Sequence, residues 1–164
     1  MTNADTARRW VIKALGEKAL ASQAADFRPA ALGALAASGN NTIATWLLDE
    51  WQDDRLRLSE KRNLLRGIMA IRATRETGYR WLRAHLDDLA SGNEGIFFTA
   101  RLPQLVGGFC TTERASEFER ELSPRFAGKP GELELARAIE RVRNCSILKA
   151  AMAQQVADDI AALR

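Results

Sequence analysis

The sequence predicts an all-α protein, and three observations lead to that prediction. Ala, Leu, Arg and Glu, which favour helices, fill most of the 164 positions. Alternating runs of β-branched residues are few, and no Asn-Gly or Asp-Gly pair marks a hairpin. Apolar residues recur instead at spacings of three and four, as on the buried face of a helix. We therefore expect about eight helices and essentially no sheet.

Four helices are expected in the first half of the chain. The first spans about 5–22, the second begins near Pro29 and ends at 38–40, and the third spans about 41–51. Proline is tolerated in the first turn of a helix, and glycine is common just after the last turn. The fourth follows Ser59, a candidate N-cap, and carries a run of apolar residues.

The fifth and sixth helices lie in the middle of the sequence. Thr74 is expected to cap the fifth, which ends at 91–93. The sixth covers about 95–109 and contains Pro103. Because proline inside a helix removes a hydrogen bond and clashes with the preceding turn, we expect a kink or break near 101–102.

Two more helices complete the prediction. Thr111 or Thr112 caps the seventh, the segments 123–124 and 128–131 are expected loops, and the last helix begins near Glu132. One stripe of this last helix is expected to comprise Leu135, Ile139, Val142, Ser146 and Lys149, widened by Leu133, Ala136, Ile147 and Ala150.

Short helices joined by short loops pack antiparallel with their neighbours. We therefore expect residues 1–164 to form a single helical domain, with antiparallel helix pairs stacked in a HEAT- or armadillo-like right-handed superhelix. No strict repeat period is visible, so the stack would be irregular. Stacks of this kind form concave surfaces that bind extended partners.

The charges favour solvated helix faces. The 24 basic and 21 acidic residues are interleaved and leave a net charge of +3. A nucleic-acid surface would need basic residues clustered on one face, so we expect no nucleic-acid partner. The sequence lacks both a run of about 18 apolar residues and an N-terminal signal segment, so we expect a cytoplasmic chain with no membrane partner.

The residues that usually carry chemistry are sparse. His85 is the single histidine, and its spacing to Asp87 and Asp88 does not converge on a metal. Cys110 and Cys145 are too few and too far apart for a disulfide framework, and their apolar contexts suit buried thiols, although a bridge between them stays open. We expect no catalytic residue, no metal ligand and no cofactor in this chain.

Glycine and tryptophan have structural interpretations as well. The pair at 107–108 is expected to mark close helix packing or a helix end, since the rest of a phosphate-loop pattern is missing. The four tryptophans are expected to anchor the core or the contacts between helices rather than to form a ligand cage: Trp10, Trp46, Trp51 and Trp81.

Three segments, taken in order, point to a family. They are Thr74-Arg75-Glu76 followed by a helix with Trp81, then Leu102-Pro103 with Gly108-Phe109-Cys110, then Glu140 with Asn144-Cys145. This series resembles the C-terminal helical domain of the aminopeptidase N and puromycin-sensitive aminopeptidase family, zinc exopeptidases of the gluzincin type. The resemblance is clearest over 53–150, and 1–52 are compatible with the preceding helices of the same domain.

The resemblance implies a parent polypeptide with an N-terminal β-domain, a thermolysin-like catalytic domain and this helical domain last. The family's zinc ligands and catalytic glutamate lie in the catalytic domain and none maps onto this sequence, so the chain should be inactive alone. In the family, the helical domain closes over the active site and forms a wall of the peptide chamber. The implied partners are the catalytic domain of the parent and peptide substrates.

A chamber wall that receives peptide carboxylates would use arginine, whose planar fork matches a carboxylate. The candidate substrate-binding residues are Arg101, beside the expected break, and Arg72 and Arg75, near the start of the fifth helix. Salt bridges to neighbouring helices are the alternative role for each.

A different class of function is a free-standing helical-repeat scaffold that binds a protein or peptide. Such a scaffold should have polar capping helices at both ends. A helical domain belonging to an aminopeptidase should instead expose an apolar patch where the catalytic domain docks.

Overall fold

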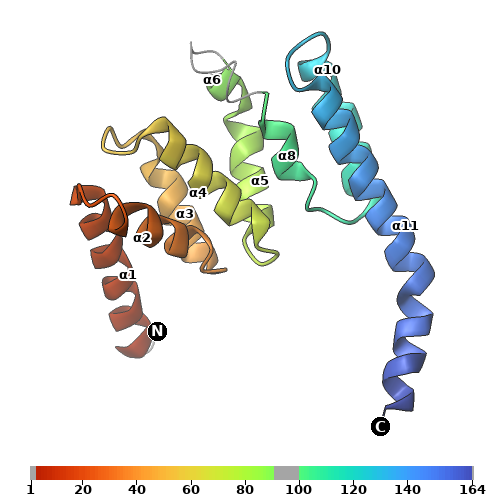
Figure 1. Ribbon diagram of the computed structural model, residues 1–164, viewed down its shortest axis with the longest axis horizontal. Coiled ribbons are helices and arrows are strands. Elements are labelled where there is room, and N and C mark those ends of the chain that lie inside the picture. Colours follow the sequence, from red (N-terminus) through yellow and green to blue (C-terminus); the bar gives the residue numbers. More distant parts are fainter. Residues whose placement is uncertain (1–2, 91–99, 164) are drawn as a thin grey trace. The chain divides into compact units, whose positions relative to one another are not determined.

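The computed structural model describes residues 3–90 and 100–163, and side chains over 10–89 and 100–163. These residues form ten α-helices and one 3₁₀ helix and contain no strand, which confirms the all-α class (Figure 1). The contacts fall into two compact units, Met1–Leu86 and Asp87–Arg164. The helix count exceeds the expected eight partly because of two short helices. The first, α6 (Leu86–Ala90), occupies the last part of the predicted fifth helix, and the second, α10 (Ser123–Phe126), begins in a predicted loop.

The first unit is a stack of short helices. Its elements are α1 (Asn3–Ala21), α2 (Phe27–Ala36), α3 (Asn41–Asp49), the 3₁₀ helix η1 (Glu50–Gln52), α4 (Leu58–Ala70) and α5 (Arg75–Ala84). Here α2 packs on α1 and α4, and α5 packs on α3 and α4. The core is built from buried apolar side chains that include Leu32, Leu35, Leu47, Leu65, Ile68 and Tyr79.

Glycine lets two of these helix pairs approach closely. A Cβ at Gly67 would lie 2.8 Å from the Cβ of Ala36, where α4 crosses α2. A Cβ at Gly78 would lie 2.7 Å from the Cγ of Met69, where α5 meets α4. The absence of a side chain at both positions is therefore part of the packing.

Two N-cap predictions in this unit are corrected. Arg57, not Ser59, precedes α4, and the Glu60 carboxylate accepts the backbone N–H of Arg57 at 2.9 Å. A glutamate in the first turn that reaches back in this way fixes the start of the helix. Thr74 does precede α5, but its hydroxyl donates to the carbonyl of Ile68 at 2.8 Å, so it satisfies the end of α4.

The predicted fifth helix is divided. It ends at Ala84, and α6 (Leu86–Ala90) follows after His85. The expected helix end at 91–93 and the start of the sixth helix at 95–99 lie outside the described residues.

A helix begins at the point where a kink or break was expected, near 101–102. Arg101 is the N-cap of α8 (Leu102–Val106), and Pro103 falls in its first turn, where its missing N–H costs nothing. The helix stops at Gly107 and does not extend to Phe109, so the glycine pair marks a helix end as predicted.

The second unit also contains α9 (Thr112–Glu121), α10 (Ser123–Phe126) and α11 (Glu132–Ala162). Thr111 caps α9 by accepting the backbone N–H of Arg114 at 3.2 Å. The loop expected at 123–124 is wrong, because Pro124 stands in the first turn of α10. The loop expected at 128–131 is confirmed: Gly128 and Gly131 have φ of 69° and 99°, a region that favours glycine.

The last helix buries less than the sequence predicts. It packs on α8, α9 and α10, and Leu135, Ile139 and Val142 are buried there as expected. Ser146 is half-buried, but the other positions assigned to the stripe are exposed: Leu133, Ala136, Ile147, Lys149 and Ala150. None of the described residues of this unit covers the second half of the helix, where 147–163 are exposed.

The tryptophans also divide into buried or half-buried residues and an exposed one. Trp51 is buried and Trp46 and Trp81 are half-buried, as expected of anchors between helices. Trp10 is 73% exposed, so the expectation of an anchor is wrong for that residue.

Candidate functional site

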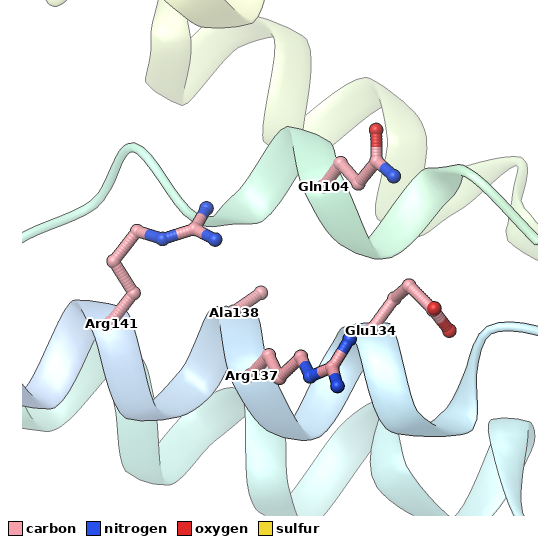
Figure 2. A pocket seen from close by; sticks show the side chains of 5 residues that line it. All are labelled: Gln104, Glu134, Arg137, Ala138 and Arg141. Carbon is pink, nitrogen blue, oxygen red and sulfur yellow. The ribbon is translucent and has the colours of Figure 1, made fainter.

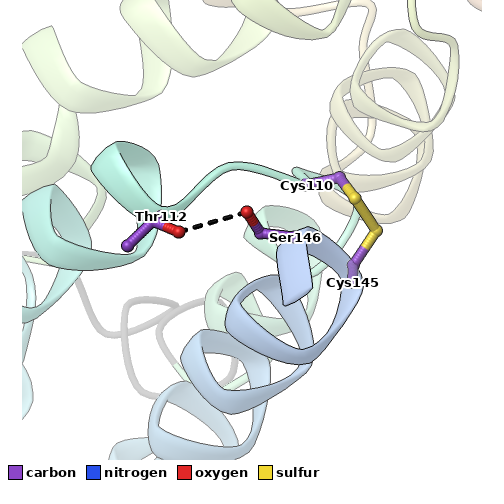
Figure 3. Close-up of a disulfide and its surroundings, with 4 residues drawn as sticks. All are labelled: Cys110, Thr112, Cys145 and Ser146. Atoms are coloured by element: carbon purple, nitrogen blue, oxygen red, sulfur yellow. Dashed lines mark hydrogen bonds between the residues drawn. A yellow bond between two sulfur atoms is a disulfide. The ribbon is translucent and has the colours of Figure 1, made fainter. Parts of the chain in front are cut away.

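A disulfide joins the middle of α11 to the segment just before α9 (Figure 3). Cys110 and Cys145 are bonded, with their Cα atoms 5.1 Å apart, so the expectation of two buried thiols is wrong. Beside the bond, the hydroxyls of Thr112 and Ser146 lie 3.1 Å apart. The sequence left this bridge open, because the packing that brings the two segments together cannot be read from cysteine spacing.

One cavity of about 360 Å³ lies between α8 and α11. It is lined by Gln104 from α8 and by Glu134, Arg137, Ala138 and Arg141 from α11 (Figure 2). The spacing of the four α11 residues places them on one side of that helix. Both walls are firmly held, because Leu102 and Val106 of α8 are buried, as is Ala138 itself.

The position of one guanidinium depends on a glycine. A Cβ at Gly107 would lie 2.7 Å from Nη1 of Arg141. Because Gly107 has no side chain, the Arg141 guanidinium can lie against the backbone at the end of α8 and close one side of the cavity.

The cavity lining has an excess of positive charge. Arg137 and Arg141 lie one helical turn apart, and Glu134 is the one acidic side chain among the lining residues. None of these three side chains forms a hydrogen bond or ion pair with another described residue, and neither does the side chain of Gln104. Within the described ranges, a ligand would therefore have no partner to displace from these polar groups.

The three predicted substrate-binding arginines fall in different units. Arg72 and Arg75 belong to the first and Arg101 to the second. Arg75 donates to the carbonyls of Met69 and Ala70, each at 2.9 Å, and so satisfies the end of α4. Burial, with a contribution from Arg72, lowers the pKa of Arg75.

Arg72 and Arg101 are exposed, and Arg101 precedes α8 in the same unit as the cavity. Neither is among the residues that line it.

Sequence reasoning missed Arg137 and Arg141. A like-charged pair four residues apart, beside the apolar stripe of the last helix, could have drawn attention to them. The contribution of Gln104 could not be found in this way, because it depends on how α8 lies against α11.

A buried ion pair organises the first unit. Arg28, only 4% exposed, donates from Nε and Nη2 to the two oxygens of Glu60 at 2.7 and 2.9 Å. The same guanidinium donates to the carbonyls of Leu20, Ser22 and Arg55. The hydrogen bonds from Arg28 hold the pKa of the Glu60 carboxyl below its usual range. With every donor directed at protein oxygens, Arg28 is structural.

His85 belongs to an aromatic cluster. Its ring stacks on Trp81 with centroids 4.4 Å apart, and Nδ1 lies 2.8 Å from the Trp81 carbonyl oxygen. Trp81 in turn packs on Trp51 at 4.5 Å. The described part of the chain brings together no three His, Cys, Asp or Glu side chains that could hold a metal ion.

Over the described ranges, no helix has both the length and the apolar character needed to cross a membrane. Comparison with known proteins adds no family assignment: the sequence matches no protein-family model, and no curated protein matches it significantly.

Proposed function

We propose that this chain is the non-catalytic C-terminal helical domain of a zinc metallo-aminopeptidase, which closes over the active site and shapes the peptide-binding chamber. The observation that carries the proposal is the second half of α11, where every residue from 147 to 163 is exposed. The exposed apolar side chains there are Ile147, Leu148, Met152, Val156, Ile160 and Leu163.

Such a surface needs a partner. Leu148, Met152, Val156 and Ile160 follow one another at intervals of four residues and form a ridge along the helix. The stability of helices in proteins comes mainly from packing an apolar face. A docking surface for another part of a longer polypeptide meets this requirement.

The other terminal helix supports the same choice. In α1, Trp10 and Val11 are 73% and 58% exposed. A free-standing helical-repeat scaffold, the second candidate, requires terminal helices with polar outer faces. Both terminal helices of this chain expose apolar side chains instead, which favours the aminopeptidase proposal.

The residues that carry the family resemblance also belong to the framework of the fold. Thr74 is fully buried and bonds to the end of α4. Pro103 is buried at the start of α8. Cys110 and Cys145, which come from two separate resembling segments, are joined. This is the pattern expected when a resemblance reflects a shared structure.

Within this proposal, the helix pairs extend as a HEAT- or armadillo-like right-handed superhelix, and its concave side faces the peptide. Zinc and the hydrolytic residues stay in the catalytic domain of the parent. This chain contributes a wall of the peptide chamber and the closing motion. It therefore positions the peptide at a distance from the residues that hydrolyse it.

The test combines this chain with the catalytic part of an aminopeptidase of this family, produced without its own helical domain. We expect association by analytical ultracentrifugation and a changed rate of peptide hydrolysis. Met152→Glu combined with Val156→Glu should abolish the association, because charge replaces the apolar ridge.

Ala161→Glu is the matched control, since nine residues place it on the opposite face of α11 from Met152. Association that survives the double substitution would remove the ridge from the docking surface. A chain that neither associates nor alters hydrolysis, yet binds extended peptides alone, would establish the scaffold instead.

A further inference from the structure

We infer that the cavity between α8 and α11 binds a small oxyanion, a carboxylate or a phosphate group, between the guanidinium groups of Arg137 and Arg141. The inference concerns this chain alone and does not depend on the docking proposed above. It follows from the charge, the size and the construction of the cavity.

The charge favours an anionic ligand, and Arg137 and Arg141 are both exposed to it. Like charges four residues apart on a helix repel one another. Other arginines of this unit have carboxylate partners, as Arg125 does in Asp87 at 2.7 Å and Arg143 in Glu119 at 2.8 Å. Arg137 and Arg141 have none among the described residues, and they face the same cavity. A bound oxyanion would supply the missing negative charge.

The geometry of arginine selects the ligand class. A guanidinium presents a planar fork of N–H donors that matches the oxygens of a carboxylate or phosphate. Gln104 lines the opposite wall, on α8 (Figure 2). Glu134 can accept a hydrogen bond from an N–H of the same ligand. An acylated amino acid or a peptide has such an N–H beside its terminal carboxylate.

The size of the cavity limits the ligand. Its volume of about 360 Å³ lies near the lower end of the range of small-molecule pockets, roughly 300–1,000 Å³. The cavity therefore suits a chain terminus or a free anion rather than a large cofactor.

The cavity is also held in place before any ligand arrives. Buried side chains fix α8 against α11, and the Cys110–Cys145 bond ties the segment after α8 to α11. Gly107 leaves the space in which the Arg141 guanidinium lies. A ligand would thus bind without reorganising the backbone, which favours affinity.

The experiment titrates the full chain, followed by NMR, with three probes: an N-acetylated dipeptide with a free carboxylate, the same dipeptide amidated, and inorganic phosphate. We expect at least one oxyanion to shift resonances of α8 and α11, and the amide not to. Arg137→Gln and Arg141→Gln should each weaken binding about tenfold or more, because each removes a charge-assisted hydrogen bond.

Two further variants separate position from charge. Arg120→Gln removes the same charge from α9, away from the cavity, and should leave binding unchanged. Gly107→Ala keeps the net charge but displaces the Arg141 guanidinium and should weaken binding. Circular dichroism verifies that each variant is folded.

Each result of the titration either supports or overturns the oxyanion inference. Binding of the free-acid dipeptide alone identifies a carboxylate as the source of the oxyanion, and binding of phosphate alone identifies a free phosphate; both support the inference. It is overturned if neither oxyanion binds, if the amide binds equally well, or if Arg120→Gln weakens binding as much as the cavity variants do.

Discussion

Arg28 shows how much of a small helical unit can depend on one side chain. Its guanidinium meets oxygens from the end of α1, from the segment before α4 and from Glu60 in α4. Burying such a pair is expensive in itself, so its net contribution to stability is modest. Removing one partner is different, because the other charge then stays buried and uncompensated.

Arg28→Met should therefore lower the free energy of unfolding by about 3–5 kcal/mol. The measurement is urea unfolding of the purified variant beside the wild type. Arg55→Met is the control, since Arg55 pairs with Asp53 and Glu17 at the surface and its loss should matter far less. Equal losses in the two variants would contradict the structural role of Arg28.

The same pair predicts a dependence on pH. The hydrogen bonds from Arg28 lower the pKa of Glu60 in the folded state, so the unfolded state binds more protons as the pH falls. The contribution of the pair is fully present above the unfolded pKa of about 4.3 and is lost as the pH falls through the lower folded value. Urea midpoints at pH 6 and at successively lower pH measure this loss.

Glu60→Gln provides the comparison for that experiment. It should be less stable at neutral pH and lose less stability on acidification than the wild type, because the titrating carboxylate is gone. A parallel decline in both proteins would place the acid sensitivity elsewhere, for example at Asp53, whose pKa is lowered by its hydrogen bonds with Arg55.

At the scale of elements, the distance between helices is set by the smallest side chains. Alanine favours a helix over glycine by about 1 kcal/mol, so a glycine in mid-helix needs a packing reason. Gly67 has one, because Ala36 of α2 occupies the space where its Cβ would stand. At Gly33 the space that a Cβ would take is open, with no atom within 4 Å, so its conformational cost brings no packing benefit.

These two glycines give a matched pair of variants. Gly33→Ala should raise the free energy of unfolding by up to about 1 kcal/mol. Gly67→Ala should lower it, because overpacking costs roughly 1–3 kcal/mol and exceeds the same gain in helix propensity. Thermal unfolding of both variants measures the two signs. A stabilised Gly67→Ala would mean that α2 and α4 separate easily.

The existence of the helices was largely predictable from the sequence, whereas the residues at which they begin and end were less predictable. Pro103 and the glycines at 128 and 131 mark boundaries by backbone chemistry alone, and the structure agrees with them. Ser59 was wrongly predicted as an N-cap, and 123–124 were wrongly predicted as a loop. Whether a residue caps a helix or lies in a loop depends on which neighbouring group accepts the hydrogen bond. The cavity was not predictable, since its lining joins two helices whose mutual register leaves no trace in residue spacing.

On the scale of the whole molecule, the contacts divide the chain into two units, and the disulfide lies within the second. The bond closes a loop between residues that are 35 apart in sequence. By the loop-closure argument, such a crosslink contributes about 3–4 kcal/mol. That contribution acts on the second unit, where α9 and α11 meet.

Reduction, or Cys110→Ser with Cys145→Ser, should therefore raise amide exchange in α8, α9 and the first half of α11 while leaving α2 to α5 unchanged. Exchange over 147–163 should be fast in every form, because no neighbour within the described chain covers that segment. Hydrogen exchange followed by mass spectrometry measures all three regions at once. Uniform acceleration along the chain would mean that the two units unfold as one.

The position of the disulfide also has a mechanical consequence. Cys145 lies just before the exposed part of α11, so the disulfide bond anchors the helix at the base of that part. The exposed segment beyond it, residues 147–163, is about 25 Å long. A force on the end of that segment would reach the backbone before α9 through the disulfide bond. We expect α11 to bend beyond Ser146 before its first half, which carries Arg137 and Arg141, separates from α8 and α9.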